Sequence, residues 1–224
     1  MRLSCFDLCV DILFAENRIN VLILEKPEIF TEFLERILRQ CGGTESGLLL
    51  SEDDKKLSFD KHVTIVHSPM LLELNSKRIQ NYLFQEMKSI SDDFLFKEKE
   101  SINSAIVNYL DNIEKRLPYP IRFDVELDAA ALFKCYEVQL DFEPLSLLEK
   151  LLNYLQLEKM LCKTKLVILV NIKAYLEQSQ IEELYKFAFY NKIQILLLES
   201  EEKGCLPNEK YYIIDKDRCL IVHE

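Results

Sequence analysis

Three carboxylates at alternate positions are the feature of the sequence best suited to chemistry. Asp124, Glu126 and Asp128 stand in the segment IRFDVELDAAALFK, residues 121–134, just before three consecutive alanines. In an extended segment, side chains two residues apart point to the same side. Such a cluster of oxygen ligands suits a hard cation such as calcium. Further acidic residues close by are Glu137, Asp141 and Glu143.

The acidic segment does not follow the EF-hand pattern. With Asp124 as position 1 of the loop, Ala129 stands where the sharp turn needs glycine, and Cys135 stands where a bidentate glutamate belongs. The same carboxylates could hold magnesium in a nuclease, but two-metal chemistry needs ligands that converge from separate elements. A solvated strand face in an acidic protein is the third interpretation. The residues alone leave these alternatives open.

A phosphate-binding loop is missing from the place where one would be expected, between the first buried strand and the next helix. The sequence there is LILEKPEIF, which has no glycine; Glu25 and Glu28 would repel phosphate, and Pro27 lacks an N–H. Asn171 ends another buried strand, where many nucleotide hydrolases carry an acidic metal ligand, and we expect it to cap the following turn. The sequence therefore argues against nucleotide binding.

The cysteines follow no disulfide framework. They are seven, an odd number, and are scattered along the chain: Cys5, Cys9, Cys41, Cys135, Cys162, Cys205 and Cys219. We interpret them as the reduced thiols of a cytoplasmic protein. Asp7 and Asp11 interrupt the apolar N-terminus, which argues against a signal peptide. No segment approaches the roughly 18–20 apolar residues that a membrane helix needs, so we expect no membrane association.

The overall charge is acidic, with 38 acidic and 28 basic residues and a formal net charge of −10. This balance does not favour nucleic acid as a partner, although it leaves room for a local basic surface. Lysines gather modestly in the polar segment 51–61. No basic motif interleaved with aromatic residues supports base-specific readout. Binding to the phosphate backbone would need only a favourable arrangement of lysines.

The two ends of the chain alternate between strand and helix patterns. Short apolar runs predict buried strands, an alternating run predicts a further strand, and apolar residues at helical spacing predict helices. The predicted strands are 19–25, 62–68, 165–171 and 193–200. The predicted helices are 179–192 and one in segment 26–43 that Gly42 and Gly43 end. The segments YYIID and CLIVHE predict a closing hairpin, and segment 51–61 predicts a turn with one edge strand. This alternation is typical of an α/β sheet that is at least partly parallel.

The middle of the chain is mostly charged and helical. An apolar stripe of period 3.6 runs from Ile102 to Leu117, the segment LPYP breaks the chain, and a second long helix is predicted over residues 143–161. Two long helices with a short acidic segment between them suggest a helical projection folded back on itself. We therefore expect an α/β head domain of residues 1–74 and 163–224, with a helical leg domain of residues 75–162 inserted in it.

The order of these elements resembles a known family. The apolar strand INVLILE comes first, the acidic FDVELD lies mid-chain, and the last part reads LLEKLLNYLQLEKMLCKTKLVILVNIKAYLEQSQIEELYKFAFYNKIQILLLES before a short YYIIDKD tail. This order is similar to that of the type II-A CRISPR adaptation proteins of the Csn-two family. The likeness is closest over residues 144–215.

The resemblance implies a fold and an assembly. The head domain would be like a P-loop ATPase that has lost the phosphate loop, with the helical leg domain inserted. Members of the family form a ring-shaped homotetramer that threads linear double-stranded DNA without sequence preference, bind calcium, and are not known as enzymes. They act with the spacer-acquisition nucleases and the RNA-guided effector nuclease.

The resemblance also implies site residues. The family's acidic segment matches Asp124, Glu126 and Asp128, and Glu137 and Glu143 are candidate additional ligands; alanines replace polar positions at 129–131. The lysines that we expect to face DNA are Lys55, Lys56, Lys61 and Lys134. The leading hypothesis is a non-enzymatic, calcium-stabilised binder of linear DNA in spacer acquisition. The alternatives are a magnesium-dependent nuclease and an acidic helical scaffold.

Overall fold

Two separate units make up the chain. The computed structural model describes residues 1–44, 47–143 and 146–223. Residues 1–74 and 143–224 form one unit, which we call the α/β unit, and residues 75–142 form the other, which we call the helical unit.

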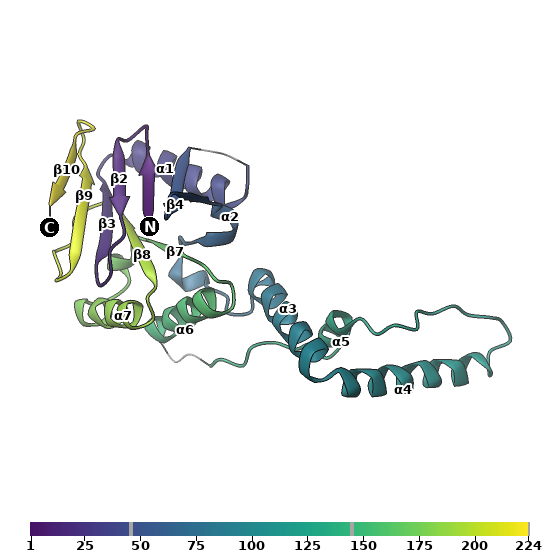
Figure 1. The fold of residues 1–224 in the computed structure, drawn as a ribbon. Helices are drawn as coiled ribbons and strands as arrows, with labels where there is room; N and C mark the ends of the chain where they lie inside the picture. Colours follow the sequence, from purple (N-terminus) through teal and green to yellow (C-terminus); the bar gives the residue numbers. More distant parts are fainter. Residues whose placement is uncertain (45–46, 144–145, 224) are drawn as a thin grey trace. The chain divides into compact units, whose positions relative to one another are not determined.

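A six-stranded sheet forms the centre of the α/β unit (Figure 1). In spatial order its strands are β10 (Leu220–His223), β9 (Glu209–Ile214), β3 (Ile19–Leu24), β8 (Gln194–Glu199), β7 (Leu166–Val170) and β6 (Val63–Val66). Neighbouring strands run parallel, except that β10 is antiparallel to β9. Every residue of β3 and β7 is buried, as expected for parallel strands covered on both faces. The predicted strands and the closing hairpin are confirmed.

A second, smaller sheet is antiparallel throughout. Its strands, in spatial order, are β2 (Val10–Leu13), β1 (Arg2–Cys5), β4 (Leu48–Glu52) and β5 (Lys55–Leu57). The sequence predicted only the edge strand β5. The other strands are four or five residues long, and an alternation as short as that of β2 is a weak signal until a partner strand is known.

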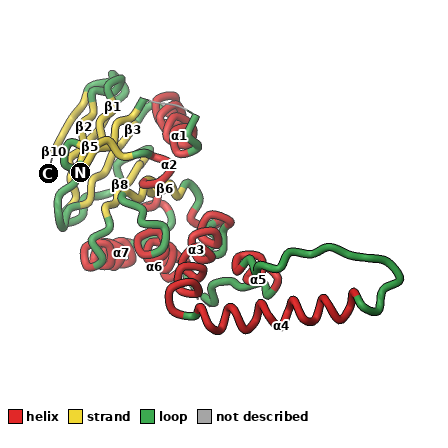
Figure 2. Tube along the Cα trace, turned by 45° about the vertical axis from the view of Figure 1, so that its right-hand side comes forward, coloured by secondary structure: helices red, strands yellow, loops and turns green. Residues whose placement is uncertain are grey.

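Helices cover both faces of the large sheet. The helices of the α/β unit are α1 (Pro27–Cys41), α2 (Phe59–His62), α6 (Leu147–Met160) and α7 (Gln178–Tyr190), with 3₁₀ turns at Pro69–Leu71 and Ile172–Ala174. Val21 packs in one core with residues of α6 and α7. Its neighbour Leu22 packs in a second core with α1 and the small sheet, because successive strand residues point to opposite faces. Helices α6 and α7 lie side by side in Figures 1 and 2.

Helix α6 belongs to the α/β unit. The second part of this unit therefore begins before α6 and not at residue 163 as expected. Ser146 and Glu149 form a capping box at its start. Leu151 and Leu155 are fully buried in the core against the large sheet. The predicted helix over 143–161 is confirmed from Leu147 onward, while Pro144 lies outside the described residues. An apolar stripe shows that a helix packs against something, but it does not show which part of the protein covers the stripe. For this reason the sequence placed α6 in the wrong unit.

The helical unit consists of α3 (Lys77–Phe94), α4 (Phe96–Glu114) and α5 (Ala129–Cys135). Helix α5 packs on α3 through the rings of Phe84 and Phe133, whose centroids are 5.9 Å apart. No residue of α4 is fully buried, and Ile102 and Tyr109 of its predicted apolar stripe are 44% and 68% exposed. Within the described ranges, no helix is both long and apolar enough to cross a lipid bilayer.

Candidate functional site

A hollow in the helical unit brings together three of the five predicted metal ligands. Its volume is about 700 Å³. Asp124, Glu126 and Asp128 line it from the segment before α5, and Asp92 lines it from α3. These four carboxylates therefore share one open space, although they come from two parts of the chain. We call this space the acidic hollow.

The acidic segment is not a strand. Residues 121–128 form an irregular loop with a bend at Val125 and Glu126. The alternate spacing of the three carboxylates therefore does not place them on one side of an extended strand. The side-chain nitrogen of Asn103 on α4 donates to the carbonyl oxygen of Val125 at 2.9 Å, which ties the loop to the helix. Asp128 accepts a hydrogen bond from the backbone N–H of Ala130 at 3.0 Å and caps α5. The following alanines are strong helix formers and continue as α5.

Two lysines also line the acidic hollow, Lys88 of α3 and Lys99 of α4. The Lys99 ammonium lies 2.6 Å from a carboxylate oxygen of Asp92. The hydrogen bond between them lowers the pKa of Asp92 and raises the pKa of Lys99, and the charge of Glu126 adds to the effect on Lys99. The hollow thus holds four carboxylates and two ammonium groups, with a net negative charge.

The residues of the hollow have the right chemistry for a hard cation, but they do not converge. Among the described residues, no three acidic, histidine or cysteine side chains come close enough to hold a metal ion. The residues that could bind calcium are Asp92, Asp124, Glu126 and Asp128, all of them oxygen donors. An ion coordinated by Asp92 would have to displace Lys99 from it.

Two of the predicted ligands lie elsewhere. Glu137 follows α5 in a left-handed turn, with φ of 50°, and does not line the hollow. Glu143 belongs to the α/β unit. Conversely, Asp92 was not among the predicted ligands, because no local spacing links α3 to the loop before α5.

The predicted DNA-facing lysines are exposed, but they fall on different units. Lys55 and Lys56 lie on the edge strand β5, and Lys61 lies on α2, all in the α/β unit. Lys134 lies on α5 in the helical unit. None of the four forms an ion pair with another residue in the part of the chain that the structure describes. Their charges are available to a ligand.

The carboxyl end of the large sheet has no room for a phosphate loop. Only Glu25 and Lys26 separate β3 from α1, and the backbone N–H of Glu25 donates to the carbonyl of Ile214 at 3.1 Å. Asn171 has φ of 50°, and its side-chain oxygen accepts from the backbone N–H and hydroxyl of Ser200 at 2.9 and 3.1 Å. It therefore joins the ends of β7 and β8, and does not cap the following turn with its side chain as expected.

A buried ionic network lies beneath α7. The ammonium of Lys173 is 2.7 Å from a carboxylate oxygen of Glu209, and both side chains are almost fully buried. Glu209 also accepts hydrogen bonds from the hydroxyls of Tyr185 and Tyr211 and from the backbone N–H of Leu206. Burial and this carboxylate raise the pKa of both tyrosines. Because the network is satisfied and closed to solvent, its role is structural.

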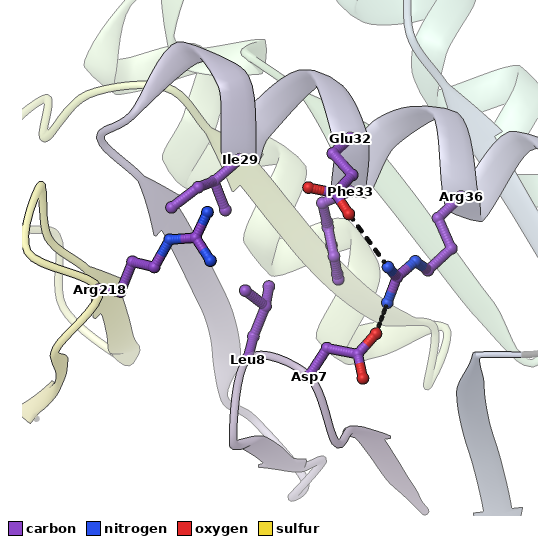
Figure 3. A pocket seen from close by; sticks show the side chains of 7 residues that line it. All are labelled: Asp7, Leu8, Ile29, Glu32, Phe33, Arg36 and Arg218. Atoms are coloured by element: carbon purple, nitrogen blue, oxygen red, sulfur yellow. Dashed lines mark hydrogen bonds and ion pairs between the residues drawn. The ribbon is translucent and has the colours of Figure 1, made fainter.

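A smaller hollow, of about 230 Å³, lies beside α1 (Figure 3). Leu8, Ile29 and Phe33 form its apolar part. Arg36 bridges Asp7 and Glu32, at 3.3 Å from Glu32, and the hydrogen bond to Asp7 raises its pKa. Arg218 lies on the opposite side of the hollow in Figure 3. The bridged charges fasten the β1–β2 turn to α1, and nothing in the set resembles a catalytic group.

Comparison with known proteins identifies the family. The model of the CRISPR-associated protein family Cas_Csn2 matches residues 40–218. The chain belongs to this family. The resemblance predicted from the order of strands and helices is therefore confirmed.

Two curated Csn2 proteins match over nearly their whole length. The CRISPR-associated protein Csn2 of Enterococcus faecalis is 21% identical over 220 residues, which cover 89% of this chain and 96% of that protein. The Csn2 protein of Streptococcus agalactiae is 22% identical over 208 residues, which cover 90% of each chain. A solved structure of cbiO1 from Clostridium perfringens, part of the ABC transporter complex cbiONQ, aligns over 92% of this chain and 76% of that chain. Its identity is 14% and its TM-score is 0.46, a likeness too low to establish a shared fold.

The Csn2 family match includes both regions of candidate site residues. It spans Lys55, Lys56 and Lys61 in the α/β unit and the whole acidic hollow in the helical unit. At about 21% identity, however, the match assigns no role to a single side chain.

Proposed function

We propose that this member of the Csn2 family binds linear double-stranded DNA, without reading its sequence, during CRISPR spacer acquisition. The observation that carries the proposal is the pair of adjacent exposed lysines on β5, Lys55 and Lys56, with Lys61 close in sequence on α2. Their charges are not used by ion pairs within the described residues. Lysines of this kind bind phosphates as point charges and carry no sequence information.

A ring-shaped homotetramer would reconcile this activity with the acidic composition. At a net charge of −10, a single chain repels DNA at long range. In a ring, lysines from four copies face one central hole, while the acidic residues face outward or hold cations. Lys134, on α5, is the further candidate for the inner face. Helix α4, which exposes Ile102 and Tyr109, offers apolar surface for contacts between copies.

Calcium is the cation that we propose for the acidic hollow. Asp92, Asp124, Glu126 and Asp128 would supply the oxygen ligands, and the ion would stabilise the helical unit by joining the loop before α5 to α3. Glu137 and Glu143 are not part of this proposed set. Because Lys99 now pairs with Asp92, binding of the ion requires that pair to open.

The α/β unit would then serve as a scaffold like a P-loop ATPase that does not bind nucleotide. The two-residue connection between β3 and α1 supports this proposal, because a phosphate-binding loop needs a longer, glycine-rich segment at that point. The protein would act in the cytoplasm, with the spacer-acquisition nucleases and the RNA-guided effector nuclease as partners.

One gel-shift series tests the proposal. Linear and covalently closed duplexes of the same sequence are mixed with the protein in calcium, magnesium or chelator, and the DNA is then freed of protein to measure its length. A ring that loads over ends shifts only linear DNA, more strongly in calcium, and leaves it intact. Binding should also weaken steeply with salt, because it depends on the release of counterions from phosphates.

A magnesium-dependent nuclease is the second candidate. The structural feature in its favour is that carboxylates reach the hollow from two separate elements, Asp92 from α3 and the others from the loop. In the same series, this candidate predicts shortened DNA in the magnesium lanes. An acidic scaffold with no nucleic-acid role predicts no shift in any lane.

A further inference from the structure

The edges of the two sheets differ in how they are protected against pairing with another strand. Edge strands present unpaired backbone groups, and proteins usually guard them with charged or covered side chains. In the described part of the chain, β5 carries Lys55 and Lys56, and β2 carries Asp11, which accepts a hydrogen bond from Ser4. The side chains of β6 are almost all buried. The edges β5 and β2 therefore carry charged side chains, and β6 packs its side chains into the cores of the α/β unit.

Strand β10 is the edge without such protection. It pairs with β9 on one side, from Leu220 opposite Ile214 to His223 opposite Tyr211, and no strand follows it in the sheet order. Figures 1 and 2 show it at the rim of the sheet. Leu220, Ile221 and Val222 are 37%, 47% and 47% exposed. Since successive residues point to opposite faces, both faces of this apolar strand are partly exposed.

We propose that β10 pairs antiparallel with β10 of a second copy of this chain, so that the two six-stranded sheets become one continuous sheet. Two identical strands that meet antiparallel satisfy a two-fold axis, the commonest symmetry of homo-oligomers. Each copy presents Leu220, Ile221 and Val222 to the same residues of its partner, and no acidic or basic side chain opposes a like charge. The open backbone groups of both strands gain hydrogen-bond partners.

The turn before β10 prepares the strand for such pairing. The side-chain oxygen of Asp215 accepts from the backbone N–H groups of Asp217 and Cys219 at 2.9 and 2.8 Å. The ring of His223 stacks on Tyr211, with centroids 5.0 Å apart and planes 6° from parallel. Both ends of the strand are therefore held, and little conformational freedom remains to be lost on association.

The short length of β10 limits what it can contribute. A pair of four-residue strands buries less than the roughly 1,000 Å² that a stable interface needs. The pairing is therefore one of the interfaces of the proposed tetramer, and in this respect it rests on the proposed function. A tetramer with two kinds of interface should split into dimers when one kind is lost.

The test measures the mass of the full chain in solution, without DNA, by sedimentation equilibrium. The variant Ile221→Lys places two lysines near each other across the two-fold axis, where like charges repel. The control is Leu13→Lys, the same change at an exposed leucine (58%) on the guarded edge strand β2. We expect a tetramer for the wild type and the control, and half that mass for Ile221→Lys. Far-UV circular dichroism checks that both variants are folded.

Cross-linking provides a second readout that does not depend on a charged variant folding. Leu220→Cys, Ile221→Cys and Val222→Cys are made one at a time in a Cys219→Ser background and oxidised with copper phenanthroline. The position nearest the two-fold axis should form a disulfide-linked dimer, and Leu13→Cys in the same background should not.

The outcomes separate the two proposals. A wild type that is monomeric at every concentration overturns both the tetramer and the β10 pairing. If the wild type is a tetramer, and neither Ile221→Lys nor any of the three cysteine variants differs from its Leu13 control, the tetramer stands and the pairing is wrong.

Discussion

The carboxyl group of Glu199 should make this protein less stable as the pH rises towards neutrality. Glu199 ends β8 and is 1% exposed. One of its oxygens accepts from the backbone N–H of Lys173 at 3.3 Å. The other is buried and has no hydrogen-bond partner among the described residues. A buried carboxylate with one unpaired oxygen is costly to ionise.

The size of the effect follows from the pKa. Burial raises the pKa of Glu199 from 4.5 to about 7, a difference of about 2.5 units. At about 1.4 kcal/mol for each pKa unit, the folded state loses roughly 3 kcal/mol relative to the unfolded state once the group is ionised in both. The folded-state pKa is the higher one, so the full stability is present below about pH 4.5. It is lost as the pH rises through about 7. Most of this loss, about 2–3 kcal/mol, falls between pH 5 and pH 8.

The variant Glu199→Gln removes the titration and keeps the shape of the side chain. Urea unfolding, followed by far-UV circular dichroism at pH 5 and pH 8, gives the free energy of unfolding of each protein. The difference in unfolding free energy between variant and wild type should shift by about 2–3 kcal/mol in favour of the variant between these pH values. Any constant cost of the new amide cancels in this comparison. Glu202→Gln, at an exposed neighbour, is the control and should show no shift.

Parallel pH profiles for wild type and Glu199→Gln would refute the reasoning. A direct measurement of the Glu199 carboxyl by carbon NMR would then locate the error. A pKa near 4.5 would mean that water reaches the unpaired oxygen. A pKa near 7 with parallel profiles would mean that the unfolded chain retains a similar environment around this group.

Three further predictions concern the ionic groups. Glu209→Gln should cost about 3–5 kcal/mol in urea unfolding, because it leaves Lys173 charged and buried without its partner. Lys99→Met should tighten calcium binding by up to about fivefold in isothermal titration calorimetry, since it removes the ammonium that competes for Asp92, while Lys97→Met should not; equal affinities for all three proteins would contradict the proposed ligand set. Lys56→Ala should make the dependence of linear-DNA affinity on salt less steep: the negative slope of log affinity against log salt should become smaller in magnitude by about one for each copy whose Lys56 contacts a phosphate. An unchanged slope would show that this lysine does not contact DNA.

Local patterns were sufficient to predict most of the large sheet. Strands β3, β7 and β8 are nearly continuous apolar runs because parallel strands are buried on both faces. Apolar residues at helical spacing were sufficient to predict helices α1 and α7. The same order of elements predicted a resemblance to the family, and the family-model match over residues 40–218 confirms it.

The small sheet, and the unit to which α6 belongs, were decided by the tertiary structure. The four residues of β2 become a strand only through pairing with β1, since a strand this short has little preference of its own. The leucines of α6 show that one face must be covered, and only the folded chain shows that the large sheet covers it.

In the candidate site, too, some features follow from the sequence and others only from the tertiary structure. The sequence determined which carboxylates are available at 124, 126 and 128, and that the alanines after them favour helix. The tertiary structure decided that Asp92 lines the same hollow, that Lys99 forms an ion pair with Asp92, and that Glu199 is buried. The physical reason is that charge and helix propensity belong to individual residues and short segments. The surroundings of a charged group depend on residues that are distant in the sequence and that only folding brings near.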